Sequence, residues 1–205
     1  MAESFLKGGK LLKHLKSYFR KYPIIPAIRN IKDLKKAMQI KDSVLIFLLT
    51  GSIFDLNKAM KLAHKNDKIL MVNIDLVNGI AHDKKGIEYL AKNNLCDGII
   101  STKGYLIKEA AKHQLMTIQR VFLLDSASLT SAQKSLKSFS VDAVEILPGI
   151  AAPYFIEKQK ELKSDYPVIA GGLIKNKEKV EELKAKGVFA VSTSDYELWN
   201  YNNKG

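Results

Sequence analysis

The sequence predicts an α/β protein of the compact (β/α)8, TIM-type barrel class, preceded by a basic amphipathic helix. From Tyr22 onward, short apolar runs alternate eight times with amphipathic, lysine-rich segments. The apolar runs are mostly continuous, which is typical of parallel strands buried on both faces. Small residues that suit a phosphate site follow the seventh and eighth runs, where barrels of this class often bind phosphate. An open doubly wound sheet is the alternative, but no G-x-G-x-x-G follows the first run.

The expected elements follow from these runs in order. The strands are expected at residues 24–28, 44–49, 69–74, 98–100, 116–123, 143–147, 168–170 and 189–191. The helices are expected at 31–38, 57–64, 84–92, 106–113, 128–139, 154–162, 177–186 and, as a short last helix, 195–199. Asn30 is expected to cap the first helix, and Gly187 to close the helix at 177–186. We therefore expect an N-terminal segment, residues 1–22, and a barrel domain, residues 23–205.

Residues 1–22 differ from the rest because they carry six Lys or Arg residues against one Glu. Leu11, Leu15, Tyr18 and Tyr22 recur at three- and four-residue spacing, so these residues predict a basic amphipathic helix. Such a helix could plug the bottom of the barrel or pack in a dimer. It could also bind RNA phosphates or an anionic membrane, and the sequence leaves these alternatives open.

Composition limits the class of protein further. The chain of 205 residues has a net charge of +12, which suggests an anionic partner, although its lysines are spread along most helices. Cys96 is the one cysteine, so no internal disulfide can form; we expect Cys96 to be a small core residue. No apolar run reaches the roughly 20 residues that cross a bilayer, and no signal peptide is recognisable. We expect a cytoplasmic protein with no membrane partner.

The strongest candidate site lies where the last two expected strands end. Gly171 and Gly172 follow the seventh strand, and Ser192, Thr193 and Ser194 follow the eighth, just before the short last helix. Glycine lets the backbone approach an anion closely, and N–H groups at a helix start can point at it. We therefore predict a phosphate site here. The alternative is that the glycines only permit a turn and the hydroxyl residues only cap the helix.

Charged side chains at the ends of other strands complete the predicted mouth of the barrel, namely Arg29, Asp75, Arg120 and Glu145. Arg29 could grip a phosphate through two parallel hydrogen bonds, or it could form an ion pair with Glu145 or Asp75. The two carboxylates could accept hydrogen bonds from ligand hydroxyls or act as general acid and base. Nothing in the sequence indicates a raised pKa, so we assign no catalytic residue.

Other reactive side chains give weaker signals. Lys103 follows a strand, where a Schiff-base lysine could lie, but the chain is rich in lysine and the signal is weak. His14, His64, His82 and His113 fall on helices or loops away from the expected strand ends and lack metal-ligand spacing. We therefore expect no metal and no cofactor.

Seven strings at the strand ends resemble one known family. They are Ile25-Pro-Ala-Ile-Arg-Asn30, Ile74-Asp-Leu-Val-Asn-Gly79, Gly98-Ile-Ile-Ser-Thr102, Ile118-Gln-Arg-Val-Phe-Leu-Leu-Asp125, Val144-Glu-Ile-Leu-Pro-Gly149, Ala170-Gly-Gly-Leu-Ile174 and Ala190-Val-Ser-Thr-Ser194 with Glu197-Leu-Trp199. Together they look like the glycerol-3-phosphate-responsive antiterminator family, regulators of bacterial glycerol uptake operons. The likeness runs from about Ile24 to Trp199, in the right order.

The resemblance implies a barrel that binds glycerol 3-phosphate and the leader mRNA of a glycerol utilisation operon. The bound protein would prevent a terminator hairpin from forming, and no catalysis is implied. Carried over by position, the phosphate would lie on Gly171, Gly172, Ser192, Thr193 and Ser194. Arg29, Asp75, Arg120 and Glu145 would line the rest of the mouth.

This chain departs from the family pattern at several positions. Asn73 stands where many members have histidine, and residues 50–52 lack an expected histidine. Lys103 and Lys175 stand where the family has arginine, so the planar guanidinium is lost. These changes bear on ligand affinity and identity more than on the fold. Two alternatives therefore stay open, which are a sensor that no longer binds its ligand and a phosphate-handling barrel enzyme acting on a glycerol phosphate or sugar phosphate.

The sequence alone leaves the RNA-binding surface and any homo-oligomer undefined. Tyr105, Tyr154, Phe155 and Tyr196 lie near the expected mouth. They could stack on RNA bases, but packing in the core or rim is the reading that we favour.

Overall fold

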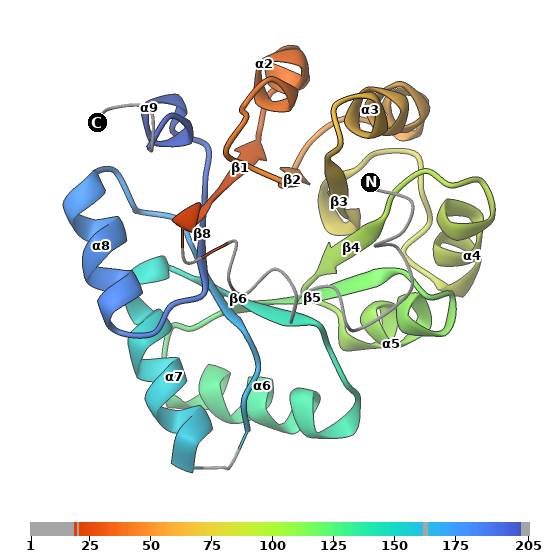
Figure 1. Cartoon of the computed structure of the whole chain (residues 1–205). Helices are drawn as coiled ribbons and strands as arrows, with labels where there is room; N and C mark the ends of the chain where they lie inside the picture. Colours follow the sequence, from red (N-terminus) through yellow and green to blue (C-terminus); the bar gives the residue numbers. More distant parts are fainter. Residues whose placement is uncertain (1–18, 20, 162–163, 202–205) are drawn as a thin grey trace.

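The computed structural model describes residues 19, 21–161 and 164–201, and they form a closed parallel barrel ringed by helices (Figure 1). Each strand pairs with the next and the last pairs with the first, which confirms the predicted barrel and excludes an open sheet. The strands are β1 (Ile24–Ile28), β2 (Leu45–Leu48), β3 (Ile69–Asn73), β4 (Gly98–Ser101), β5 (Met116–Phe122), β6 (Ala143–Leu147), β7 (Val168–Gly171) and β8 (Ala190–Thr193).

Helices follow the strands around the outside of the barrel. They are α2 (Leu34–Met38), α3 (Ile53–Lys65), α4 (Lys84–Lys92), α5 (Gly104–Lys112), α6 (Ser126–Ser138), α7 (Ala152–Glu161), α8 (Lys177–Ala185) and α9 (Tyr196–Trp199), with short 3-10 turns η2 (Ile31–Asp33), η3 (Ile74–Leu76) and η4 (Gly149–Ala151). The Asn30 side chain accepts a hydrogen bond from the Lys32 backbone N–H at 3.1 Å, which confirms the predicted cap. Gly187 has a φ of +90°, as a residue that closes a helix requires.

Four helices, α3, α5, α6 and α7, begin earlier than their apolar periodicity predicts, and polar caps set the starts of α3 and α6. The helix α3 begins at Ile53 rather than at 57, and the backbone N–H of Ser52 donates to Asp55 Oδ2 at 2.8 Å just before it. The helix α6 begins at Ser126 rather than at 128, where Asp125 accepts from the Ser128 backbone N–H at 2.7 Å. Residues 162–163, where the helix at 154–162 was expected to end, lie outside the described residues.

The core has two layers separated by the strands. Inward-facing side chains such as Ala27, Phe47 and Ile118 fill the barrel, and a second, outer layer of apolar side chains packs between the strands and the helices. Cys96 is buried in the outer layer, as expected, and burial raises the pKa of its thiol. The barrel interior is therefore packed rather than hollow, which leaves the strand ends as the place for a ligand.

Phe19 lies in the same inner layer and is 1% exposed. Its ring centroid is 5.1 Å from that of Phe189, which directly precedes β8, so Phe19 packs at the end of the barrel opposite the mouth. This position agrees with the alternative in which the N-terminal segment plugs the bottom of the barrel. The rest of the predicted helix at 1–22, apart from residues 21 and 22, lies outside the described residues.

Candidate functional site

A cavity of about 970 Å³ opens at the carboxyl ends of the strands. It brings together residues from the ends of all eight strands, as is typical of a barrel site. Of the nine residues expected to form the site, it is lined by eight: Arg29, Asp75, Arg120, Glu145, Gly172, Ser192, Thr193 and Ser194. The ninth, Gly171, is buried beside the cavity rather than lining it.

A buried polar network forms the floor of this cavity. Glu145, on β6, accepts from Arg120 Nε on β5 at 2.6 Å through Oε2 and from Ser192 Oγ on β8 at 2.6 Å through Oε1. The side chains of Glu145 and Arg120 are only 1% and 7% exposed. Both oxygens of Glu145 are therefore engaged, and the terminal nitrogens of Arg120 make no hydrogen bond with the described chain. We infer that Glu145 orients Arg120 rather than receiving a ligand hydroxyl itself.

Gly171 is required by this network. A Cβ at this position would lie 2.7 Å from Ser192 Oγ and 2.8 Å from Glu145 Oε1. Any larger residue would displace the two atoms that join β6 to β8. The expectation that Gly171 contacts the phosphate stays a prediction, since the structure gives the residue a packing reason of its own.

The turn after β7 lines the cavity and contains backbone N–H groups that have no acceptor in the described chain. Gly172 and Leu173 have φ values of +75° and +59°, and the left-handed conformation is unfavourable for leucine. The backbone N–H groups of Leu173 and of Ser194, in the turn after β8, donate no hydrogen bond to any described residue. Backbone amides that lack a protein acceptor and belong to residues lining a cavity can supply donors for an oxyanion.

The short helix α9 contributes less to this anion site than expected. Asp195, rather than a hydroxyl residue, is its N-cap, and its Oδ1 accepts from the Glu197 backbone N–H at 2.9 Å. Thr193 Oγ1 in turn accepts from the Asp195 backbone N–H at 3.1 Å. Because a carboxylate already occupies the start of α9, a bound phosphate would depend on the two turns rather than on the helix.

Two cations in the cavity lining form no ion pair. Arg29 and Lys175 are exposed, and neither lies within 4.0 Å of a carboxylate oxygen of the described residues. The alternative in which Arg29 pairs with Glu145 or Asp75 is therefore wrong. Glu145 forms its ion pair with Arg120, and the cation nearest to Asp75 is Lys103. These two cations remain available to an anionic ligand.

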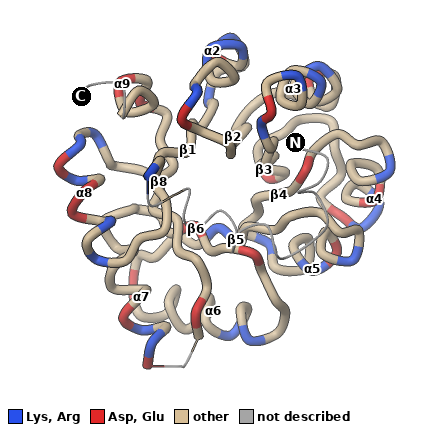
Figure 2. Tube along the Cα trace, viewed as in Figure 1, with Lys and Arg blue, Asp and Glu red and all other residues tan. Residues whose placement is uncertain are grey.

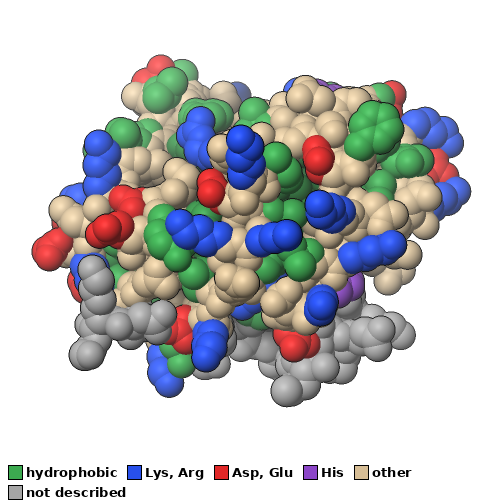
Figure 3. Space-filling view, turned by 90° about the horizontal axis from the view of Figure 1, so that it is seen from above, with side chains coloured by type: hydrophobic (Ala, Val, Ile, Leu, Met, Phe, Trp, Pro, Cys, Tyr) green, Lys and Arg blue, Asp and Glu red, His purple; other side chains and the backbone are tan. Residues whose placement is uncertain are grey.

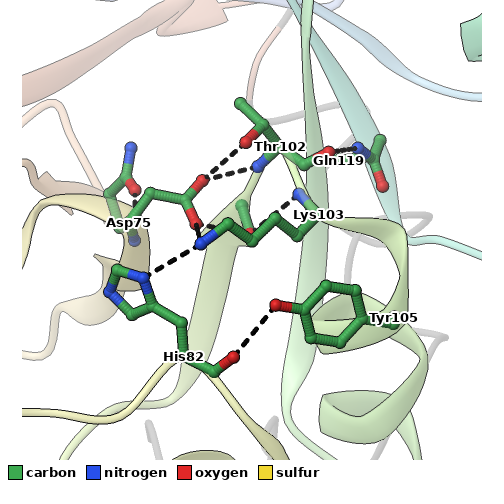
Figure 4. Close-up of polar contacts among 8 residues, drawn as sticks. Asp75, His82, Thr102, Lys103, Tyr105 and Gln119 are labelled. Carbon is green, nitrogen blue, oxygen red and sulfur yellow. Dashed lines mark hydrogen bonds and ion pairs between the residues drawn. The ribbon is translucent and has the colours of Figure 1, made fainter.

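Asp75 is held by the end of β4 (Figure 4). Its carboxylate accepts from Ser101 Oγ at 2.9 Å, from the Thr102 backbone N–H at 2.7 Å and from Thr102 Oγ1 at 3.0 Å. Asn73 Oδ1 accepts from the Asp75 backbone N–H at 3.0 Å, so asparagine has a structural role at this departure from the family pattern. The Asp75 side chain is thereby fixed at the edge of the cavity.

His82 also lies in this cluster, contrary to the prediction that the histidines lie away from the strand ends. Its Nδ1 is 3.0 Å from Lys103 Nζ, and its backbone oxygen accepts from Tyr105 Oη at 2.9 Å (Figure 4). Lys103 Nζ is also 4.0 Å from Asp75 Oδ1. The loop that carries His82 has no periodicity that could have predicted this return to the mouth.

The aromatic residues expected near the mouth divide into two groups. Tyr105, Tyr154 and Tyr196 are 57%, 50% and 41% exposed, whereas Phe155 is buried in the outer core. Phe155 is therefore not available to stack on RNA. Within the described part of the chain, no three His, Cys, Asp or Glu side chains are grouped as metal ligands would be, and no helix is long and apolar enough to cross a membrane.

Substituting Gly172 with alanine tests the turn after β7. Its Cβ would meet only Leu147 Cδ2, at 3.7 Å, so the cost comes from the positive φ rather than from a clash. We expect Gly172→Ala to lower the free energy of unfolding by about 1 kcal/mol, measured by urea denaturation. Gly187→Ala, at a positive φ far from the cavity, is the control for strain alone. An unchanged free energy of unfolding in the Gly172→Ala variant would contradict this account.

The chain is similar to one family of proteins in sequence and in structure. A family model described as glycerol-3-phosphate responsive antiterminator matches residues 24–199. The glycerol uptake operon antiterminator regulatory protein from Listeria monocytogenes is similar in structure, with a TM-score of 0.80 and 36% identity, over 86% of this chain and 94% of that one. A glycerol uptake operon antiterminator-related protein from Thermotoga maritima gives a TM-score of 0.75 and 30% identity, over 86% and 97% of the two chains.

A further protein is similar in sequence, and a further solved structure is similar in fold alone. The uncharacterized protein YgcP from Escherichia coli is 29% identical over 185 residues, which cover 90% of this chain and 95% of that protein. Orotidine 5'-monophosphate decarboxylase from Sulfolobus solfataricus has a TM-score of 0.60 at 10% identity, over 84% and 88% of the two chains, and shares the fold alone.

Proposed function

Since this chain belongs to the glycerol-3-phosphate responsive antiterminator family, we propose that it binds glycerol 3-phosphate in the mouth cavity and acts as a transcription antiterminator. In this proposal the liganded protein binds the leader mRNA of a glycerol utilisation operon and keeps a terminator hairpin from forming. It would do so in the cytoplasm and without catalysis. The strongest support for the ligand comes from Leu173 and Ser194. Their backbone N–H groups have no acceptor in the described chain, and both residues line the same cavity as Arg29.

The two ends of the ligand fit two different parts of the cavity. The phosphate is assigned to the turns after β7 and β8, where backbone amides can donate to its oxygens and Arg29 supplies a planar, doubly donating cation. The glycerol hydroxyls are assigned to the side of Arg120 and Asp75, because the terminal nitrogens of Arg120 have no other acceptor among the described residues. Glu145 and Ser192 then act as positioning residues for Arg120.

In this proposal the loops of the cavity close on the ligand, because the cavity is large for a molecule of this size. About 970 Å³ lies near the upper end of the range of roughly 300–1,000 Å³ that is typical of small-molecule sites, while glycerol 3-phosphate is a small ligand. A ligand changes RNA affinity only if it binds one conformation better than another. Ordering of the turns after β7 and β8 around the phosphate is the conformational step that we assign to this switch.

A phosphate-handling barrel enzyme is the second candidate, because two carboxylates, Asp75 and Glu145, line the same cavity. General acid–base catalysis requires a carboxyl that can reach the substrate and exchange a proton. Glu145 has both oxygens engaged, and the Asp75 carboxylate accepts three hydrogen bonds from the end of β4. These contacts favour the regulator over the enzyme.

Three measurements on the full chain separate the alternatives. Calorimetry with glycerol 3-phosphate, beside glycerol and inorganic phosphate, tests the ligand; absence of heat with glycerol 3-phosphate would support a sensor that no longer binds it. Leader RNA binding with and without ligand tests the regulatory function. Turnover of glycerol 3-phosphate by the protein alone would support the enzyme and contradict the regulator.

A further inference from the structure

The side of the barrel covered by α2 and α3 carries a concentration of positive charge (Figure 3). From Arg29 to Lys65 the sequence has eight Lys or Arg residues, three aspartates and no glutamate. Figure 2 shows that this contrasts with α8, along which acidic and basic residues alternate. The net positive charge is therefore concentrated on one side of the barrel, although lysines occur along most of its helices.

The lysines of this side also differ in their partners. On and next to α4, α5, α7 and α8, lysines pair with glutamates three or four residues away at 2.6–3.2 Å. No lysine from Lys32 to Lys65 lies within 4.0 Å of a carboxylate oxygen of the described chain. Their charge is thus not neutralised locally, and it is available to an external anion.

Three of these lysines share one face of α3 with an aromatic residue. Phe54, Lys58, Lys61 and Lys65 are spaced by four, three and four residues, which places them along one stripe of the helix, and all are exposed. The opposite face of α3 packs into the core. Phe54 is 90% exposed, more than any other large apolar side chain in the described residues.

The stripe forms one wall of a groove between α2 and α3, which we call the basic groove. The groove has a volume of about 550 Å³ and is lined by Lys35, Phe54, Asn57, Lys58, Lys61, Leu62 and Lys65. Four of these residues are lysines and none is acidic. A concave, positively charged surface with one protruding ring has the chemistry of a single-stranded nucleic acid site, in which phosphates contact lysines and a base stacks on an aromatic face.

We propose that the basic groove is the surface on which this protein binds single-stranded RNA. Lys35, Lys58, Lys61 and Lys65 contact the RNA backbone, and Phe54 stacks on one base. The proposal rests on the proposed function for the presence of an RNA partner, and it adds where that partner binds. An anionic membrane fits this surface less well, because a membrane-bound helix buries a broad apolar face and α3 exposes one apolar ring.

The position of the groove also connects it to the ligand cavity. Arg29 lines the cavity and leads directly into η2 and α2, one wall of the groove. On the same helix, Lys36 Nζ lies 3.2 Å from the centroid of the Tyr196 ring, which belongs to α9 and follows the turn of Ser194. Ligand binding can therefore act on α2, and so on the groove, by two routes, which are the chain that continues from Arg29 and the contact between Lys36 and Tyr196.

The test compares two triple variants of the full chain that lose the same charge. Lys58→Gln/Lys61→Gln/Lys65→Gln removes the stripe, and Lys92→Gln/Lys112→Gln/Lys186→Gln removes three lysines that are paired with glutamates. The probe is a fluorescently labelled single-stranded RNA of mixed sequence, about 20 nucleotides long, titrated at several salt concentrations with saturating glycerol 3-phosphate. We expect the stripe variant to reduce the slope of log affinity against log salt by about 2, and the affinity at 0.15 M salt about 40-fold. We expect the control to change the affinity less than about 3-fold.

Phe54→Ala separates stacking from charge. We expect RNA affinity to fall about 10-fold with the salt slope unchanged, because stacking on an aromatic ring involves no phosphate contact. Phe54→Tyr keeps the ring and should retain the affinity. Unchanged glycerol 3-phosphate affinity in every variant shows that the barrel is folded.

The outcomes distinguish this proposal from the proposed function. Equal RNA affinities in the two triple variants, with the wild type binding RNA, would overturn the basic groove and leave the antiterminator function in place. A wild type that binds neither this probe nor the leader RNA at low salt, with or without glycerol 3-phosphate, would overturn both. Loss of binding to phosphatidylserine vesicles in the stripe variant, with RNA affinity unchanged, would assign the groove to membranes instead.

Discussion

Replacing Arg120 with alanine is expected to lower the free energy of unfolding by about 3–5 kcal/mol, because it leaves the Glu145 carboxylate buried without its cation. Glu145 is 1% exposed and would keep only the hydrogen bond from Ser192 Oγ. Part of the cost is also the cavity left by the lost side chain. Urea denaturation at neutral pH, followed by circular dichroism and by tryptophan fluorescence, measures the change.

The double variant Arg120→Met/Glu145→Met is the matched control. It removes both charges and retains similar side-chain volume, so it should recover much of the stability lost in the single variant. Both variants should lose affinity for glycerol 3-phosphate, since the account assigns the terminal nitrogens of Arg120 to the ligand. A loss of less than about 1 kcal/mol in Arg120→Ala would contradict the structural importance that we assign to the buried pair of Arg120 and Glu145.

Replacing Arg29 with alanine is expected to weaken glycerol 3-phosphate binding about 100-fold with little change in stability. Hydrogen bonds to charged groups contribute about 1.5–3 kcal/mol each, and an exposed side chain that pairs with no described residue contributes little to folding. Calorimetry gives the affinity, and urea denaturation should show a change within about 0.5 kcal/mol.

Two further variants show whether the effect of Arg29→Ala comes from the planar donors of the guanidinium and from its position in the cavity. Arg29→Lys keeps the charge and loses the planar pair of donors, so its affinity should fall between those of the wild type and Arg29→Ala. Lys32→Ala removes a nearby exposed cation that does not line the cavity, and it should change ligand affinity less than about 2-fold. Equal affinities in wild type and Arg29→Ala would remove Arg29 from the site.

The barrel could be predicted from sequence because its strands are buried on both faces. Continuous apolar runs placed β1 and β6 residue for residue, and the amphipathic pattern did the same for α4. The strand ends also identified the mouth, because polar residues at the carboxyl ends of buried barrel strands are commonly residues of the binding site. This is why eight of the nine expected site residues line one cavity.

The remaining features depend on partners that a single sequence does not show. The pairing of Glu145 with Arg120 and Ser192 joins three strands, and sequence spacing gives no sign of it. His82 reaches the site through a loop without periodicity. The lysines of α3 look like those of α8 until the structure shows which of them lie next to a carboxylate.

The central claim is that backbone amides at the ends of β7 and β8 bind the phosphate of glycerol 3-phosphate. The most direct test is a two-dimensional ¹H–¹⁵N NMR titration of the full chain with glycerol 3-phosphate, with glycerol as the reference. We expect the largest ligand-specific shifts at the amides of Leu173 and Ser194, and we expect that glycerol alone does not produce them. Saturable binding of glycerol 3-phosphate that leaves these two amides unshifted would contradict the account.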